Sequence, residues 1–161
     1  MTTDLTTDHT TTLTALEARI QRLEDRAAIV DVVISYAAAI DRRDWDTWSS
    51  LFTDQVHVDF SEAGLPAADF PREQFVGFAR QGLDPWPATQ HLSPNHQVVI
   101  DGDEAVCYSS MYAQHHTEQG DYVMRGSYDN HLVRTANGWK IARLVQHVSW
   151  LEGDPRMATS S

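Results

Sequence analysis

The spacing of apolar residues changes along this chain from a helical period to a strand period. Near the start, six apolar residues follow one another in alternating steps of four and three, a series that we call the seam: Leu16, Ile20, Leu23, Ala27, Val30 and Ile34. Such spacing places side chains on one helix face. From about residue 89 onward, the alternation typical of strands takes over. Helices followed by long strands predict an α+β fold, with three helices packed over one face of a curved antiparallel sheet.

The predicted elements form one domain between two tails. Residues 1–12 are rich in Thr and Asp, so we expect a flexible tail there. Thr14 and Glu17 fit a capping box, and the domain is predicted over residues 13–152, with a C-terminal tail over 153–161. Two shorter helices are expected, at 45–52 and near 72–81. The strands are expected at 56–60, 89–100, 105–117, 122–135 and 139–150.

The seam has two interpretations. It predicts either one amphipathic helix lying on its own sheet or a face shared with a second subunit.

Composition limits the partners and the compartment. Asp and Glu number 23 against 12 Lys and Arg, which gives a formal net charge of -11. That charge opposes binding to nucleic acid or to anionic membranes, and no segment is apolar enough to span a bilayer. The single cysteine, Cys107, excludes an internal disulfide and any multi-cysteine metal site. We therefore expect a cytoplasmic protein.

Asp41 interrupts an apolar face. Steps of four from Val33 through Ala37 arrive at this carboxylate, which should therefore face the core. A buried carboxylate is costly unless it is paired, and the best candidate partner is His91 in the segment TQH. A carboxylate that orients a histidine inside an apolar cavity makes a general base. The alternatives are that Asp41 caps the next segment or pairs with Arg42 or Arg43, and that His91 is a core imidazole bonded to backbone.

Strand alternation predicts which other polar side chains share a face. One set comprises Cys107, Ser109, Met111, Ala113 and His115, the next comprises Ser127, Asp129, His131 and Val133, and a third comprises Trp139, Ile141, Arg143, Val145 and His147. Isolated polar groups among small residues suit a concave surface that holds a ligand. Which of the adjacent His115 and His116 faces inward is left open.

Other chemistries find less support in the residues. His91, His115 and Asp41 could together bind a metal as two histidines and one carboxylate, but no HxH or HxxxH pair stands near a carboxylate at ligand spacing. No GxSxG motif and no glycine-rich phosphate loop are present, so nucleophilic catalysis and a nucleotide cofactor are not expected. The site is predicted to work without metal or cofactor.

The motifs resemble a known family. The segments YAAAIDRRDWDTWSSLF, VHVDF, TQH, DGDEAVCYSSMYAQHH and GWKIARL are similar to those of the SnoaL-like (polyketide-cyclase-like) branch of the NTF2-like superfamily, from about Leu16 to Trp150. In layout they resemble scytalone dehydratase, lindane dehydrochlorinase and bile acid 7α-dehydratase. The resemblance implies a cone-shaped barrel with a deep pocket between the long helix and the sheet. It also implies cofactor-free chemistry and, with the long helix, a homodimer or homotrimer.

The resemblance also implies roles for individual residues. Asp41 matches an aspartate that orients a catalytic histidine, His91 matches that histidine, and His115 matches a second active-site histidine. Ser127 falls at a substrate-contacting serine, and Tyr36 lies near a catalytic tyrosine about one helical turn before Asp41. The pattern departs from the family where Ile40 and Phe60 replace tyrosines and Asp129 replaces an asparagine, and the arginine of the dehydrochlorinase has no clear match.

These observations predict a cofactor-independent lyase that acts on a small, largely apolar, ring-containing substrate. His91 would remove a proton next to a carbonyl, and His115 with Tyr36 or Tyr128 would donate to the leaving oxygen or polarise the carbonyl. Further substrate contacts are expected from Trp45, Phe60, Met111, Tyr128, Ser127 and Asp129. An isomerase or cyclase with the same base, and a non-catalytic binding or dimerisation module, are the alternatives.

Overall fold

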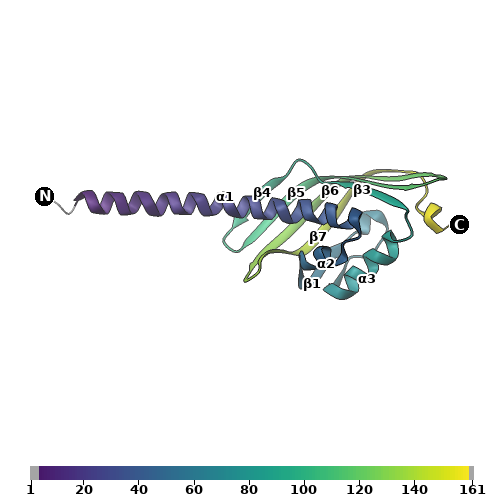
Figure 1. Ribbon diagram of the computed structural model, residues 1–161, viewed down its shortest axis with the longest axis horizontal. Helices are drawn as coiled ribbons and strands as arrows, with labels where there is room; N and C mark the ends of the chain where they lie inside the picture. Colours follow the sequence, from purple (N-terminus) through teal and green to yellow (C-terminus); the bar gives the residue numbers. More distant parts are fainter. Residues whose placement is uncertain (1–3, 160–161) are drawn as a thin grey trace.

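A computed structural model describes residues 4–159 as an α+β fold in which helices cover one face of a sheet (Figure 1). The helices are α1 (Asp4–Arg42), α2 (Trp45–Ser50) and α3 (Arg72–Leu83), with short 3-10 turns η1 (Ser61–Ala63) and η2 (Pro155–Thr159). The strands are β1 (Phe52–Asp59), β2 (Ala68–Pro71), β3 (Ala88–Leu92), β4 (Gln97–Asp101), β5 (Glu104–Thr117), β6 (Gly120–Thr135) and β7 (Gly138–Glu152).

The seven strands form one sheet in the order β2-β1-β7-β6-β5-β3, and β4 also pairs with β5. The predicted fold class is confirmed, although the sheet is mixed rather than wholly antiparallel, because β1 runs parallel to β7. The three long strands β5, β6 and β7 are the meander expected from the alternating pattern. The helix α1 crosses the sheet so that its C-terminal turn lies beside the edge strand β3 (Figure 1).

Several predicted elements differ from the observed ones. The segment predicted as one strand over 89–100 is two strands, because Pro94 lacks an N–H to donate and Asn95 has φ 64. Strand β2 was not predicted. The helix α1 begins at Asp4, so most of the segment that we expected to be a flexible tail is helical; residues 1–3 lie outside the described range. Near the other end, residues 155–159 form η2, and residues 160–161 are not described.

Aromatic side chains fill the space between the helices and the sheet. Trp48 on α2 lies 4.7 Å from Phe52 and 5.1 Å from Phe75 between ring centroids, and none of the three is more than 6% exposed. Tyr36 on α1 joins this cluster through Trp48 at 5.4 Å. Each such ring buries a large apolar area and prefers tilted or edge contacts like these. The core therefore holds α2 and α3 against the sheet below α1.

Irregular pairing in β7 changes which side chains face the core. Ile141 pairs with Leu132, whereas Arg143 pairs with the adjacent His131, so two steps along β7 correspond to one step along β6. This shift turns the Arg143 side chain away from the core. The predicted set from Trp139 to His147 therefore divides between two faces. A second shift lies beside Gly126, where a Cβ would stand 1.8 Å from the His147 carbonyl oxygen. Only glycine fits that close approach of two strands.

An ion pair fixes the middle of α1 to the far end of the sheet. The buried Asp25 carboxylate accepts hydrogen bonds from Arg134 on β6 at 2.6 and 2.8 Å and from the Trp139 indole at 3.2 Å. Arg134 also contacts the exposed Asp103 at 2.9 Å. The hydrogen bonds from Arg134 outweigh burial and lower the pKa of Asp25 to about 2.

None of the helices within residues 4–159 has the length and apolar character to span a membrane.

Replacing Asp25 with Asn should reduce the free energy of unfolding by about 1–3 kcal/mol at neutral pH, because two bonds from Arg134 lose their charged acceptor. Since the folded-state pKa lies below the usual 3.8, the stabilisation is complete above pH 4 and disappears as the pH falls toward 2. Urea unfolding of both proteins between pH 7 and 2.5 measures this, and the two curves should converge at low pH.

Asp103→Asn is the matched control, because this carboxylate contacts the same Arg134 but is 82% exposed. It should change stability by less than about 0.5 kcal/mol. Equal losses in the two variants would contradict the role given to Asp25.

Candidate active site

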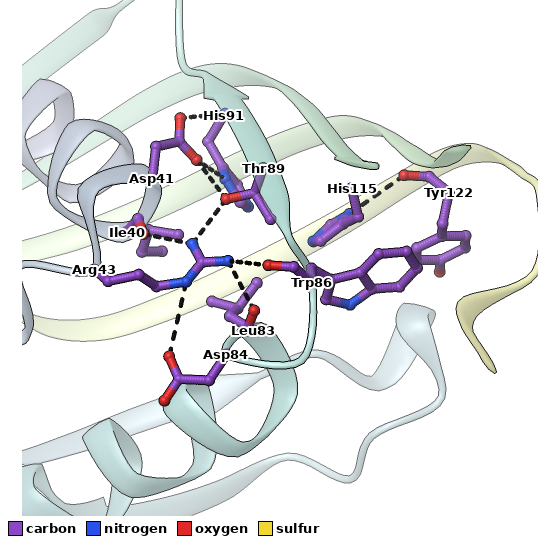
Figure 2. Close-up of polar contacts among 10 residues, drawn as sticks. All are labelled: Ile40, Asp41, Arg43, Leu83, Asp84, Trp86, Thr89, His91, His115 and Tyr122. Carbon is purple, nitrogen blue, oxygen red and sulfur yellow. Dashed lines mark hydrogen bonds and ion pairs between the residues drawn. The ribbon is translucent and has the colours of Figure 1, made fainter. Parts of the chain in front are cut away.

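The Asp41 carboxylate, in the last turn of α1, binds strand β3 through both oxygens (Figure 2). Its Oδ1 accepts from the His91 Nδ1 at 2.7 Å and from the Thr89 hydroxyl at 3.0 Å. Its Oδ2 accepts from the His91 backbone N–H at 2.7 Å. The strand alternates so that Thr89 and His91 both face α1, while Gln90 between them is exposed. Asp41 and His91, fifty positions apart in the chain, are therefore in direct contact.

These contacts determine the tautomer of the neutral His91 ring. A carboxylate can only accept, so the Nδ1 of His91 carries the hydrogen, and in the neutral ring the Nε2 then has the free electron pair. Burial raises the pKa of Asp41, but the hydrogen bonds from the His91 ring, the His91 backbone and Thr89 outweigh it, and the pKa lies below its usual value. Asp41 is therefore a carboxylate at neutral pH, and the tautomer of His91 is that of a general base.

The pair lies in the wall of a hollow between α1 and β3. The hollow has a volume of about 390 Å³ and is lined by both members of the pair and by seven further residues: Ile34, Ala37, Ala38, Arg42, Gln90, Leu92 and Ser93. The His91 side chain is only 9% exposed and that of Asp41 is 23% exposed. A small, partly apolar molecule in this hollow would meet the Asp41–His91 pair.

His115 lies on the inner face of β5, behind His91. The two rings are in edge contact with centroids 5.4 Å apart, and Trp86 covers His115 at 5.1 Å. The neighbouring His116 points outward to Asp121 at 2.6 Å, so His115 is the inward member of the two. Burial, aided by the nearby His91, lowers the pKa of His115 to about 4.

The neutral His115 ring acts as an acceptor. Its Nδ1 is 3.3 Å from the Tyr122 carbonyl oxygen, which can only accept, so Nδ1 carries the hydrogen and Nε2 does not. In this state the His115 ring can accept a hydrogen bond through Nε2. It cannot donate from Nε2, which differs from the acid role that we expected for it.

Arg43 supports the pair from the side opposite His115, and its role was not predicted (Figure 2). Its guanidinium donates to the Thr89 hydroxyl at 2.8 Å, to the Leu83 carbonyl at 2.7 Å and to the Trp86 carbonyl at 3.2 Å. It also donates to the Ile40 carbonyl at 2.8 Å. Its backbone has φ 56, which is unusual outside glycine and is characteristic of over-determined sites. The segment DRRD shows a helix end, but no sequence pattern indicates these contacts.

Four other predicted residues lie in the core rather than around the hollow. Tyr36 and Tyr128 are each 6% exposed, with ring centroids 5.8 Å apart, and Gln146 donates to the Tyr128 hydroxyl at 3.1 Å. Met111 is 4% exposed and contacts the same Gln146, while Phe60 packs against the Tyr128 ring at 6.5 Å. Burial raises the pKa of Tyr128 to about 12 and raises that of Tyr36 as well, so both phenols stay protonated.

Three predicted substrate contacts lie elsewhere. Ser127 and Asp129 alternate with the inward Tyr128 and so face the opposite side of the sheet, where Asp129 contacts His147 at 3.2 Å. Trp45 lies on α2 against Trp48 and under the guanidinium of Arg80. These three side chains do not belong to the Asp41–His91 site.

The cysteine thiol and the possible metal ligands form no further site within the residues that the structure describes. Cys107 is buried, and burial raises its pKa to about 11, so its thiol stays protonated. Within the part of the chain that the structure describes, no three His, Cys, Asp or Glu side chains come together in a group that could hold a metal ion.

The chain belongs to the SnoaL-like domain family, whose pattern matches residues 21–145. It is 29% identical over 132 residues to an uncharacterised protein of Mycobacterium tuberculosis, covering 79% of this chain and 87% of the relative. The structure of the Kfla4162 protein of Kribbella flavida is 28% identical, with a TM-score of 0.80 over 86% of this chain and 99% of that one. A proposed aromatic ring hydroxylase of Novosphingobium aromaticivorans is 27% identical, with a TM-score of 0.77 over 84% and 97%.

More distant structures share the fold alone. A proposed scytalone dehydratase of Novosphingobium aromaticivorans is 20% identical, with a TM-score of 0.72 over 81% of this chain and 88% of that one. A type 2 hexachlorocyclohexane dehydrochlorinase is also 20% identical, with a TM-score of 0.74 over 83% and 91%. The expected NTF2-like fold, with structures of both kinds among its neighbours, is therefore confirmed.

Arg43→Ala should lower the free energy of unfolding by about 2–3 kcal/mol, because three carbonyls and the Thr89 hydroxyl lose a charged donor. Urea unfolding measures the loss. Arg42→Ala removes the same side chain one position earlier, where it is exposed, and should cost less than about 0.5 kcal/mol. A loss of similar size at position 42 would show that general charge, rather than the Arg43 contacts, accounts for the effect.

The low pKa of His115 should make stability fall below neutral pH. Its folded-state pKa of about 4 lies under the usual 6.5, so protons bind preferentially to the unfolded chain between these values. The stability is fully present above pH 6.5 and declines as the pH approaches 4, by up to about 3 kcal/mol. His115→Gln should flatten this decline, whereas His116→Gln, at the exposed neighbour, should not. An NMR titration showing a charged His115 at pH 6 would contradict the assignment.

Proposed function

We propose that this protein is a cofactor-independent lyase that eliminates water or a similar leaving group from a small, largely apolar, ring-containing molecule. The observation that carries the proposal is the 2.7 Å contact between Asp41 Oδ1 and His91 Nδ1 in the wall of the hollow. In the neutral ring this contact leaves the Nε2 of His91 without a hydrogen, and both residues of the pair line the hollow. General bases of this kind typically accelerate proton transfer by about 10²–10⁴-fold.

The proposed step begins with proton removal by His91 Nε2 from a carbon next to a carbonyl group. The electron pair of the C–H bond becomes a C=C double bond as the bond from the next carbon to its hydroxyl breaks. The departing hydroxide takes the proton from the His91 imidazolium and leaves as water, which regenerates the base. The charge of Asp41 stabilises the transient imidazolium. His115 would accept a hydrogen bond from the substrate, while Tyr36 and Tyr128 would serve as protonated donors if the substrate extends into the core.

The comparisons support the class of reaction only in outline. Membership of the SnoaL-like family and neighbours named as a dehydratase and a dehydrochlorinase favour small-molecule elimination, whereas a neighbour named as a ring hydroxylase does not. Two neighbours, the aromatic ring hydroxylase and the hexachlorocyclohexane dehydrochlorinase, are named for ring compounds, which favours a ring-containing substrate. The lone Cys107, buried and reduced, fits the cytoplasm, where we propose that the protein acts.

Two alternative functions use the same residues. An isomerase or cyclase would use the His91 base without a leaving group. A binding module without catalysis is favoured by the close packing of Tyr36, Met111 and Tyr128, which leaves the core filled. The test below separates the three.

The test is to incubate the protein with cyclic β-hydroxyketones in D₂O and to follow both water loss and deuterium uptake next to the carbonyl. Wild type should accelerate water loss, measured by the absorbance of the conjugated product, and NMR should show no deuterium uptake into the remaining ketone. His91→Ala should lower the rate by at least about 10²-fold while its melting temperature changes by only a few degrees. Asp41→Asn should reduce the rate too, because the ring loses its charged partner.

His57→Ala is the matched control, since this histidine also contacts an aspartate, Asp69, but lies on β1 on the exposed surface. Its rate should equal that of wild type. Deuterium uptake without water loss would favour the isomerase or cyclase, and His91→Ala that keeps full activity would exclude the general base. Binding of the ketones with neither reaction would favour the binding module.

A further inference from the structure

The N-terminal half of α1 extends beyond the sheet (Figure 1). Every side chain that the structure describes from His9 to Glu24 is exposed, and the first buried position of the helix is Asp25. In proteins most helical stability comes from packing of an apolar face rather than from intrinsic propensity. An exposed helical segment of this length therefore requires an explanation.

The exposed segment carries the seam, which Leu13 extends by one more step of three. The large members are strongly exposed: Leu13 at 60%, Leu16 at 46%, Ile20 at 55%, Leu23 at 68% and Ile34 at 49%. Written as a heptad, Leu13, Ile20, Ala27 and Ile34 occupy position a, and Leu16, Leu23 and Val30 occupy position d. The β-branched Ile20 and Ile34 at a, with leucine at two of the three d positions, favour a two-stranded parallel coiled coil.

The charges beside the seam are segregated by sign. Position e carries Glu17, Glu24 and Asp31, and position g carries Arg19 and Arg26. Within residues 4–159 none of these five side chains makes an ion pair. In a parallel dimer each g residue meets the e residue five positions later on the other chain, so Arg19 meets Glu24 and Arg26 meets Asp31. Both pairs are of opposite charge.

An antiparallel arrangement of the two helices would bring like charges together. There g meets g and e meets e, which would bring arginine against arginine and acid against acid. The seam is therefore complementary to a second, parallel copy of itself. A membrane surface fits less well, because this helix has no excess of basic residues and the chain has a net charge of -11.

The globular part of the chain leaves room for that partner. Between Leu13 and Ile34, the residues of α1 that are buried against their own domain are Asp25, Ile29 and Val33, at heptad positions f, c and g and not at a or d. The two domains would therefore lie on the outer sides of the paired helices. We infer that the chain forms a homodimer through a parallel, in-register coiled coil along the seam, over about 33 Å from Leu13 to Ile34.

The test is sedimentation equilibrium of the full-length chain. Wild type should be a dimer, and Ile20→Lys should be a monomer with an unchanged domain melting temperature, because Ile20 is 55% exposed and lies before the first buried residue of α1. Arg19→Glu should raise the dimer dissociation constant about tenfold, since two symmetry-related pairs turn from attraction to repulsion. Adding Glu24→Arg to that variant should restore the wild-type value. Arg22→Glu, an equal charge change at position c, is the matched control and should have little effect.

The parallel orientation of the two helices is tested by a cysteine at heptad position a. Ile20→Cys should form an interchain disulfide on mild oxidation, since equivalent a residues face each other only in the parallel register, and Cys107 is buried. A monomeric wild type, a dimer that survives Ile20→Lys, or the absence of the cross-link would each overturn the proposal. Loss of the dimer with retained turnover would leave the proposed lyase unaffected, so the two proposals fail separately.

Discussion

The carboxylate of Asp41 joins the end of the long helix to the edge of the sheet, and the geometry of the candidate site depends on it. One oxygen holds the His91 ring and the other holds the His91 main chain, so ring orientation and strand position are fixed together. A carboxylate so placed is costly unless its partners satisfy it. Here Thr89 and His91 supply three hydrogen bonds. Arg43 then reaches the same Thr89 hydroxyl and connects it to the end of α3.

The helix α1 is held at two separate points by different means. At its end, the contacts of Asp41 and Arg43 determine where the last turn lies. At its middle, the buried Asp25 pairs with Arg134 and prevents the helix from pivoting over the sheet. A side chain in the last turn can therefore keep its position to within a hydrogen bond, as general base chemistry requires. Upstream of Asp25 the helix is not held by its own domain.

Sequence periodicity predicted the fold class because burial imposes a period on each type of element. The contact between Asp41 and His91 was predictable because a carboxylate on an apolar stripe needs a partner. The orientation of Ser127 and Asp129 was not, since alternation groups side chains by face but does not say which face is buried. Arg143 was assigned to the wrong face because a bulge is invisible to a period of two. The contacts of Arg43 depend on backbone carbonyls, whose positions no side-chain pattern encodes.

The bond from the His91 backbone N–H to Asp41 has a second consequence. Strand β3 is the last strand at its edge of the sheet, and this N–H points away from β5. Unpaired donors on such an edge can template the addition of a strand from another molecule. The carboxylate occupies that donor just as a neighbouring strand would. The residue that orients the imidazole thus also occupies a main-chain donor at the edge of the sheet, with which a strand from another molecule would otherwise pair.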